Sequence, residues 1–264
     1  MISAALAIGL RDLLIWSSYR TRFVSTFLAA AVSVTLFYYV SRLVNSPEVG
    51  TADDYFGFVV TGTVTLELIT ATLAAPLASL RSELLTGTFE RIVVSPFGPV
   101  ASIASLAFFP LCLAFAVAAV TIGYAAAVFG LDLVWPDALV AIPVGVLAAI
   151  SFAPFGVALS SLVLIFKQTN AGAAFVVTGI SVVAGLYFPV TLLPDWIQWT
   201  SDVQPFTPAV DLLRHFLVGT PMPGSVGGAV AQLIGFTAIT LPPAILLLRA
   251  SVRRSRRNGT ITEY

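Results

Sequence analysis

The chain has 264 residues, of which 58% are hydrophobic and only 10% are charged, and its formal net charge is zero. Soluble domains carry about 25% charged residues, so this composition indicates a protein embedded in lipid. A zero net charge excludes the overall basic footprint of a nucleic-acid-binding protein. One histidine, His215, and one cysteine, Cys112, are too few for a metal site or an internal disulfide.

Residues 1–20 place apolar side chains at helical spacing and also contain the charged pair Arg11 and Asp12. Because this pair interrupts the apolar run and no small-residue cleavage site follows, we do not expect a cleavable signal peptide. The pattern predicts an amphipathic helix lying at the membrane interface. The alternative is a continuation of the first membrane span into the cytosol.

Six stretches are apolar enough, and long enough or nearly so, to cross a membrane core about 30 Å thick. They comprise residues 23–40, 56–80, 100–129, 138–166, 172–190 and 226–248. Segment 191–219 is interrupted by several prolines and aspartates, so we do not expect it to cross. The sequence therefore predicts an all-α membrane protein in which residues 1–264 form one domain with six transmembrane helices.

Lysine and arginine residues are distributed unequally about these six spans. If the N-terminus is cytosolic, only Arg42 and Arg214 fall outside, and the other basic residues face the cytosol. Cytoplasmic loops are enriched in such residues, so we expect both termini in the cytosol, with a basic tail over residues 249–264. Tryptophans such as Trp135 and Trp196 then fall at the outer boundary of a plasma (inner) membrane, as amphipathic rings prefer.

Glu67 is the one charged residue in the middle of a predicted span. An unpaired carboxylate at that depth costs about 2.5–3.5 kcal/mol on insertion scales, so it must face protein, water or a proton. It is interpreted either as a polar contact in a translocation path or subunit interface, or as a protonated or hydrogen-bonded residue joining two helices. Both interpretations stay open from the sequence.

The chain offers no catalytic motif of its own. A P-loop requires a lysine after glycine, but the only lysine, Lys167, follows Phe166, so energy from ATP would have to come from another polypeptide. His215 next to Arg214 is typical of an interfacial polar residue. The charged link at residues 81–97 suits either a short docking helix on the membrane surface or a solvated turn.

Two motifs resemble those of type-2 ABC exporter permeases. The link SELLTGTFERIVVSP is similar to the family segment after the second span, in which an acidic residue, G-T, E-R or E-x, and S-P recur. The stretch YFPVTLLPDWIQWTSDVQPFTPAVDLLRHFLVG is similar to the family's F-P-x-x-x-L-P-x-W followed by N-P-x-x-x-x-x-D-x-x-R, with Gln204 replacing the asparagine. With six spans and cytosolic termini, the resemblance covers essentially the whole chain.

The resemblance implies partners and an internal organisation. It implies that the link at residues 81–97 is a coupling helix, which docks in a groove of a separate P-loop nucleotide-binding subunit. The residues expected to make this coupling contact are Arg81, Glu83, Gly87, Thr88, Glu90, Arg91, Ser95 and Pro96. ATP and Mg²⁺ would bind that partner, and we expect no cofactor in this chain. Two permeases, identical or different, would pair with two ATPase subunits.

The resemblance also implies that residues 191–219 form a re-entrant pair of helices before the last span. The residues that mark this segment are Pro189, Pro194, Trp196, Pro205, Asp211 and Arg214. It further implies a substrate path at the permease interface, built from the first, second and fifth spans. The candidate path residues are Glu67, Phe27, Phe37, Phe58, Phe175 and Tyr187. The aromatic residues among them could equally face lipid or the protein core.

We therefore expect a non-enzymatic permease subunit of an ATP-driven exporter. Its substrate would be an amphipathic, lipid-linked or polysaccharide-type molecule that leaves the cytoplasm. The alternative is an ion-coupled secondary transporter that uses Glu67 as its coupling site. That alternative predicts an inverted repeat with paired broken helices, neither of which the sequence shows.

Overall fold

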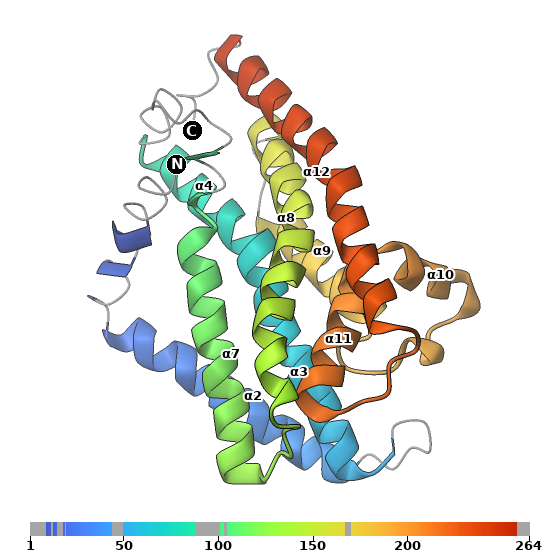
Figure 1. The fold of residues 1–264 in the computed structure, drawn as a ribbon. Helices are drawn as coiled ribbons and strands as arrows, with labels where there is room; N and C mark the ends of the chain where they lie inside the picture. Colours follow the sequence, from blue (N-terminus) through green and yellow to red (C-terminus); the bar gives the residue numbers. More distant parts are fainter. Residues whose placement is uncertain are drawn as a thin grey trace.

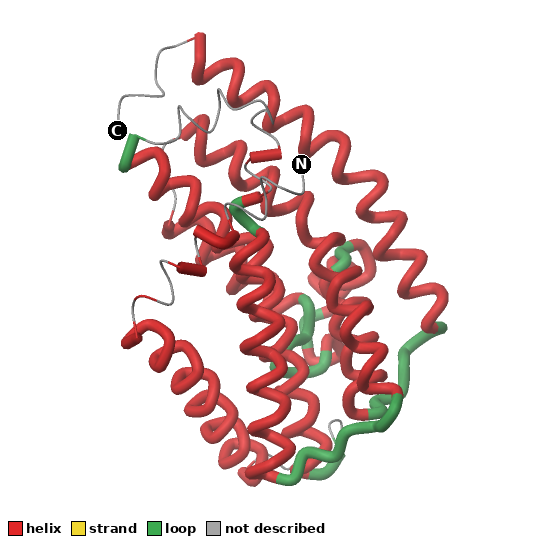
Figure 2. The backbone as a smooth tube through the Cα atoms, turned by 60° about the vertical axis from the view of Figure 1, so that its left-hand side comes forward, coloured by secondary structure: helices red, strands yellow, loops and turns green. Residues whose placement is uncertain are grey.

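The computed structural model describes residues 9–11, 13–14, 18, 20–43, 50–87, 101–102, 105–166 and 170–257. Within these ranges the regular structure is entirely helical and contains no strand (Figures 1 and 2). The all-α prediction is therefore confirmed for the described part of the chain. The elements are α2 Arg20–Leu43, α3 Ala52–Ile69, η1 Thr70–Ala74, α4 Ala75–Leu85, α7 Phe108–Phe129, η2 Asp137–Val140, α8 Ala141–Phe166, α9 Asn170–Val183, η3 Val190–Leu192, α10 Asp195–Val203, α11 Phe206–Val218 and α12 Val226–Arg257.

Five helical segments are long and apolar enough to cross a membrane, and they coincide with five of the predicted spans. They are Val24–Leu43, Ala52–Leu85, Phe108–Phe129, Asp137–Leu164 and Val226–Ser255. The last helix is longer than predicted, because α12 continues through Arg257 and so includes all five arginines of the predicted tail. The chain is a multi-pass membrane protein.

The predicted span at residues 172–190 is not confirmed. Helix α9 has 14 residues, or about 21 Å at 1.5 Å per residue, which is shorter than the hydrocarbon core. It ends at Val183 because Gly185 adopts a left-handed φ of +69° and turns the chain away from the helix axis. A sixth span therefore stays a prediction.

The second span, formed by α3, η1 and α4, occupies the centre of the bundle (Figure 1). Helices α2, α7, α8 and α11 all pack against α3. The span contains a wide π-helical turn, η1, which ends two residues before Pro76, and Pro76 has no N–H to donate to the Thr72 carbonyl. That carbonyl lies against α8 at Gly156, where a Cβ would overlap it. The missing side chain thus allows the two helices to pack closely.

Segment 191–219 forms two short helices, as the sequence predicts, while their re-entry into a membrane stays a prediction. Helix α10 begins after Pro194 and α11 begins after Pro205. Helix α11 is part of the core, since the side chains of Val210, Leu213 and Leu217 are buried. Figure 1 shows α11 beside α3 and α8, with α10 at the periphery. The end of the bundle that contains the α7–α8 connection is called the Trp135 end below.

Candidate functional site

An aromatic cluster lies toward the Trp135 end, where α2, α3 and the turn after α9 meet. Phe37 of α2 stacks on Tyr187, with 5.5 Å between ring centroids. Tyr55 of α3 stacks on Phe58 at 6.5 Å and donates its hydroxyl to the Tyr187 carbonyl at 3.3 Å. Three of the predicted path residues therefore come together with Tyr55, which the sequence analysis did not identify. All four side chains are partly exposed.

Glu67 lies on α3, nine residues or about 13 Å along the helix axis from Phe58. Its side chain is partly exposed, as are those of Thr63 and Thr70, which project from the same side of the helix. Among the residues that the structure describes, none forms a hydrogen bond or ion pair with the Glu67 carboxylate. Both interpretations of Glu67, as a contact in a path and as a residue joining two helices, stay predictions.

Phe27 and Phe175 lie away from this cluster. Phe27 precedes Phe37 by ten residues of α2, or about 15 Å along the helix axis. Phe175 lies in the first half of α9 and is 80% exposed. The structure brings together only part of the predicted path set, so any path that includes all six residues would have to run along most of the bundle.

Arg214 of α11 is a buried charged side chain, and only 3% of it is exposed. Its Nη2 donates to the carbonyls of Gly185 at 2.7 Å and Leu186 at 3.0 Å. Nε and Nη2 also donate to the Phe58 carbonyl at 3.4 Å, and the guanidinium lies 3.4 Å from the centroid of the Phe58 ring. Arg214 therefore links α11, α3 and the turn after α9.

These bonds have a physical cause in the way α9 ends. The carbonyls that follow the helix have no intrahelical donor, and the planar guanidinium offers several donors in a fixed geometry. Asp211 lies one turn earlier on α11, 3.8 Å from Nη1. Burial lowers the pKa of the Arg214 guanidinium to about 9, and the charge of Asp211 opposes this shift, so the side chain stays protonated at neutral pH. Sequence reasoning placed Arg214 in the outer segment but missed this role, although the Asp-x-x-Arg spacing on an apolar helix was a signal for it.

The other residues of the predicted re-entrant segment have simpler positions. Pro189, Pro194 and Pro205 immediately precede η3, α10 and α11, where a residue without an N–H does not cost a helical hydrogen bond. Trp196 of α10 is 75% exposed, as expected of a ring at a membrane interface. Only Asp211 and Arg214 of this set contribute to the polar network.

The predicted coupling link is described only at its beginning, at the opposite end of the bundle. Arg81 and Glu83 lie in the last turns of α4, and Gly87 has a φ of +71° just after that helix. The Glu83 side chain is mostly buried, and its Oε1 lies 2.9 Å from Nη1 of Arg11 in the N-terminal segment. The remaining coupling residues lie outside the described residues; they are Thr88, Glu90, Arg91, Ser95 and Pro96.

No three metal-ligating side chains come together in the parts of the chain that the structure describes. The arrangement instead combines a partly exposed aromatic cluster, a carboxylate and a buried arginine that fixes the cluster's backbone. Such a surface can contact a molecule with apolar and polar parts.

Comparison with known proteins gives a family match and two relatives. The model of the family described as ABC-2 type transporter matches residues 10–218. The chain is 31% identical over 144 residues to Nodulation protein J of Rhizobium leguminosarum bv. trifolii. This match covers 53% of this chain and 51% of that protein. It is 27% identical over 133 residues to Nodulation protein J of Rhizobium meliloti (strain 1021). That match covers 50% of this chain and 47% of that protein. The matched region thus spans about half the length of these curated relatives.

Proposed function

The chain belongs to the ABC-2 type transporter family, and from this premise we propose that it is the membrane-spanning subunit of an ATP-driven exporter. The observation that carries the proposal is the family match over residues 10–218, a region that contains four of the five helices long enough to span. A subunit of this family transports rather than catalyses, and it works with a separate nucleotide-binding ATPase subunit. That partner would bind the ATP and Mg²⁺.

The substrate path, in this proposal, runs along the face of α3 that carries Tyr55, Thr63 and Glu67. Support comes from the partial exposure of these side chains and from the stacked rings of Phe37 and Tyr187 beside them. A second permease, identical or homologous, would close this face into a path. Aromatic rings and a carboxylate suit an amphipathic, lipid-linked or polysaccharide-type substrate, because they offer apolar faces and polar contacts together.

Coupling to the ATPase is assigned to the link at residues 81–97. Both termini lie on the cytosolic side of the plasma membrane in this proposal. The distribution of basic residues supports this orientation. The ion pair between the exposed Arg11 and the mostly buried Glu83 supports a connection between the N-terminal segment and the start of the link. Movement of a docked ATPase would then reach the second span directly through α4.

The Glu67 carboxylate in the middle of the second span also fits the alternative of an ion-coupled transporter. Co-reconstitution with the partner ATPase in phospholipid vesicles separates the two. ATP hydrolysis should rise with substrate when a fluorescent phospholipid, a lipid-linked glycan and an amphipathic drug are tested in turn. Transport should require ATP and should not follow an imposed proton gradient. Gradient-driven transport without ATP would establish the alternative.

Single substitutions in the link test the coupling assignment. Glu90→Ala or Arg91→Ala should leave the protein folded and ATP hydrolysis measurable, but should reduce export at least tenfold. Asp202→Ala, at an exposed carboxylate of α10, is the matched control and should export normally. Normal export by both link variants would refute the assignment of residues 81–97 to coupling.

A further inference from the structure

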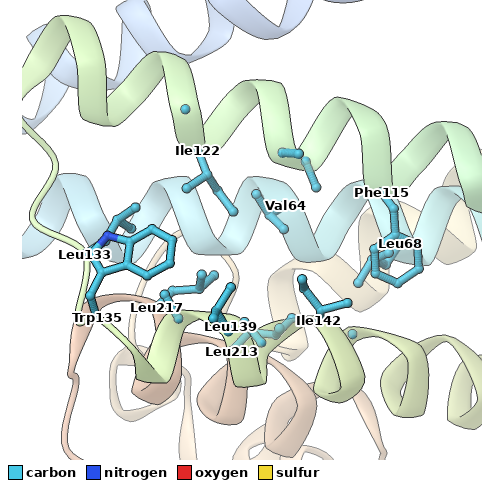
Figure 3. A pocket seen from close by; sticks show the side chains of 16 residues that line it. Val64, Leu68, Phe115, Ile122, Leu133, Trp135, Leu139, Ile142, Leu213 and Leu217 are labelled. Atoms are coloured by element: carbon cyan, nitrogen blue, oxygen red, sulfur yellow. The ribbon is translucent and has the colours of Figure 1, made fainter.

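An apolar cavity of about 320 Å³ lies between α7 and α8 (Figure 3). Val64 and Leu68 of α3 form its floor together with Leu213 and Leu217 of α11. Figure 3 shows the Trp135 ring at one end of the cavity. Apart from the indole N–H of that ring, the side chains that line the cavity carry no hydrogen-bonding group. A water molecule needs two to four polar partners, so the cavity is unsuited to water.

The cavity opens toward the lipid. Leu139 and Ile142 form its rim on η2 and α8, and their side chains are 54% and 58% exposed. Val146 and Ile150 continue this exposed apolar strip along α8. Because α7 and α8 belong to spanning segments, the medium beside this rim is hydrocarbon.

The depth of the cavity matches one leaflet of a membrane. Its α7 wall extends from Phe115 to Gly123, which is about 12 Å along the helix axis. Trp135, at the far end, belongs to the connection between the two spans, where tryptophan prefers the membrane interface. Half of the hydrocarbon core is about 15 Å thick, so the cavity runs from the interface to near the middle of the membrane.

Small residues keep this space open. A Cβ at Gly123 of α7 would have no atom within 4 Å, so that position faces empty space. Across the cavity, a Cβ at Gly145 of α8 would come within 3.0 Å of the Phe115 ring, so the gap narrows there. The volume is thus wider toward Trp135 and narrows at its inner end beside Phe115.

We propose that this cavity binds one acyl chain of a membrane phospholipid from the leaflet on the Trp135 side. A chain of methylene groups matches the apolar walls, enters sideways past Leu139 and Ile142, and reaches Phe115 with its end. The volume lies at the lower end of the range for ligand pockets, which suits one chain. The bound chain contacts α3 and α11 together, and so stabilises the position of the helix that carries Arg214.

This site is separate from the proposed substrate path. Val64 and Leu68 project from α3 in directions different from those of Thr63 and Thr70, because successive residues turn by 100° about a helix axis. The phospholipid is therefore a resident component of the bundle and not the exported molecule. Its binding requires no ATPase and no transport.

The test compares Gly123→Leu, which fills the cavity, with Gly235→Leu, which makes the same change at an open position on α12. Each protein is reconstituted in dioleoyl-phosphatidylcholine vesicles, extracted in mild detergent and examined by native mass spectrometry. Wild type and Gly235→Leu should retain one phospholipid per chain through extended washing, and Gly123→Leu should retain none. Added lipid should raise the melting temperature of the first two proteins but not that of Gly123→Leu.

A second filling variant guards against an effect specific to Gly123. Ala119→Leu adds volume from the preceding turn of the same α7 wall and should give the same loss of phospholipid. Equal retention by the filled and control proteins would overturn the proposal, as would the absence of any retained phospholipid in wild type. Because transport plays no part in these measurements, failure here leaves the exporter proposal unaffected.

Discussion

The first and second spans, α2 and α3–η1–α4, have the same mean hydropathy of 1.6, yet they occupy different environments. In the most apolar window of each, 61% of the second span is buried within the protein but only 17% of the first. In both Figure 1 and Figure 2, α2 begins apart from the other helices and approaches them toward its end. Hydropathy therefore places both helices in the membrane without determining which of them is central.

The difference between the two spans lies in small and polar residues. Lipid is as apolar as leucine, so helices in a membrane associate through close backbone contacts and hydrogen bonds. The second span offers Gly57 and Gly62 together with a row of threonines, and its Phe58 carbonyl accepts hydrogen bonds from Arg214. The first span instead presents an exposed strip of large side chains, namely Val24, Leu28, Val32, Leu36 and Tyr39.

Removing Arg214 should weaken the centre of the bundle more than any other change considered. Arg214→Met leaves the carbonyls of Phe58, Gly185 and Leu186 without their donor, and should lower the free energy of unfolding by about 3–5 kcal/mol. Arg42→Met is the matched control, because Arg42 joins α2 to Asp53 of α3 through an exposed ion pair. Unfolding in a sodium dodecyl sulfate titration should distinguish the two variants. Equal midpoints would contradict the structural role of Arg214.

Adding a methyl group where α3 contacts the turn after α9 should cause the next largest loss of stability. A Cβ at Gly62 would overlap the Leu186 carbonyl oxygen, so Gly62→Ala forces the backbone apart and should cost about 1–3 kcal/mol. Gly123→Ala, at an open helical position, should instead gain about 0.5–1 kcal/mol because alanine is the better helix former. The same titration measures both, and a stabilising Gly62→Ala would disprove the close contact.

Loss of the N-terminal cap of the second span should lower the free energy of unfolding by a moderate amount. Thr51 caps α3: its hydroxyl accepts from the Asp54 N–H at 3.2 Å, and its own N–H donates to Asp54 Oδ2 at 2.8 Å. Thr51→Ala should therefore cost about 1 kcal/mol. Thr240→Ala on α12 removes only a bond to the carbonyl one turn earlier and should cost less. A larger loss at Thr240 than at Thr51 would contradict the importance of the cap.

Sequence reasoning predicted much of the fold because long apolar runs are a local property. It did not predict where α9 ends, because the apolar run continues to Val190 but the helix ends at Val183. The end is determined by Gly185 together with the donors of Arg214, which is 29 residues away in the sequence. Such a contact cannot be recognised from the hydropathy of the run itself.

The candidate site shows the same limit. Phe37, Phe58 and Tyr187 were expected in one path from the family resemblance, and the structure brings them together. Tyr55 was missed because an aromatic residue near the start of a span is also typical of an interfacial ring. Its contact with Tyr187 depends on how the chain turns after α9, which the sequence pattern does not reveal.

The exposed strip of α2 should give the smallest change in stability and the clearest information about a second permease. Leu36 is 59% exposed, so Leu36→Ala removes contacts made largely with the surrounding medium and should change the free energy of unfolding of the isolated chain by less than about 0.5 kcal/mol. If α2 faces a second copy of the chain in the assembled transporter, Leu36→Cys should form an intermolecular disulfide on mild oxidation. Cys112 is the chain's only native cysteine, so the Cys112→Ser background leaves a single thiol. Leu246→Cys, on an equally exposed part of α12, is the control and should remain monomeric on a non-reducing gel. Cross-linking at Leu246 but not at Leu36 would place the second copy against α12, and would remove the path from the face that α2 shares with α3.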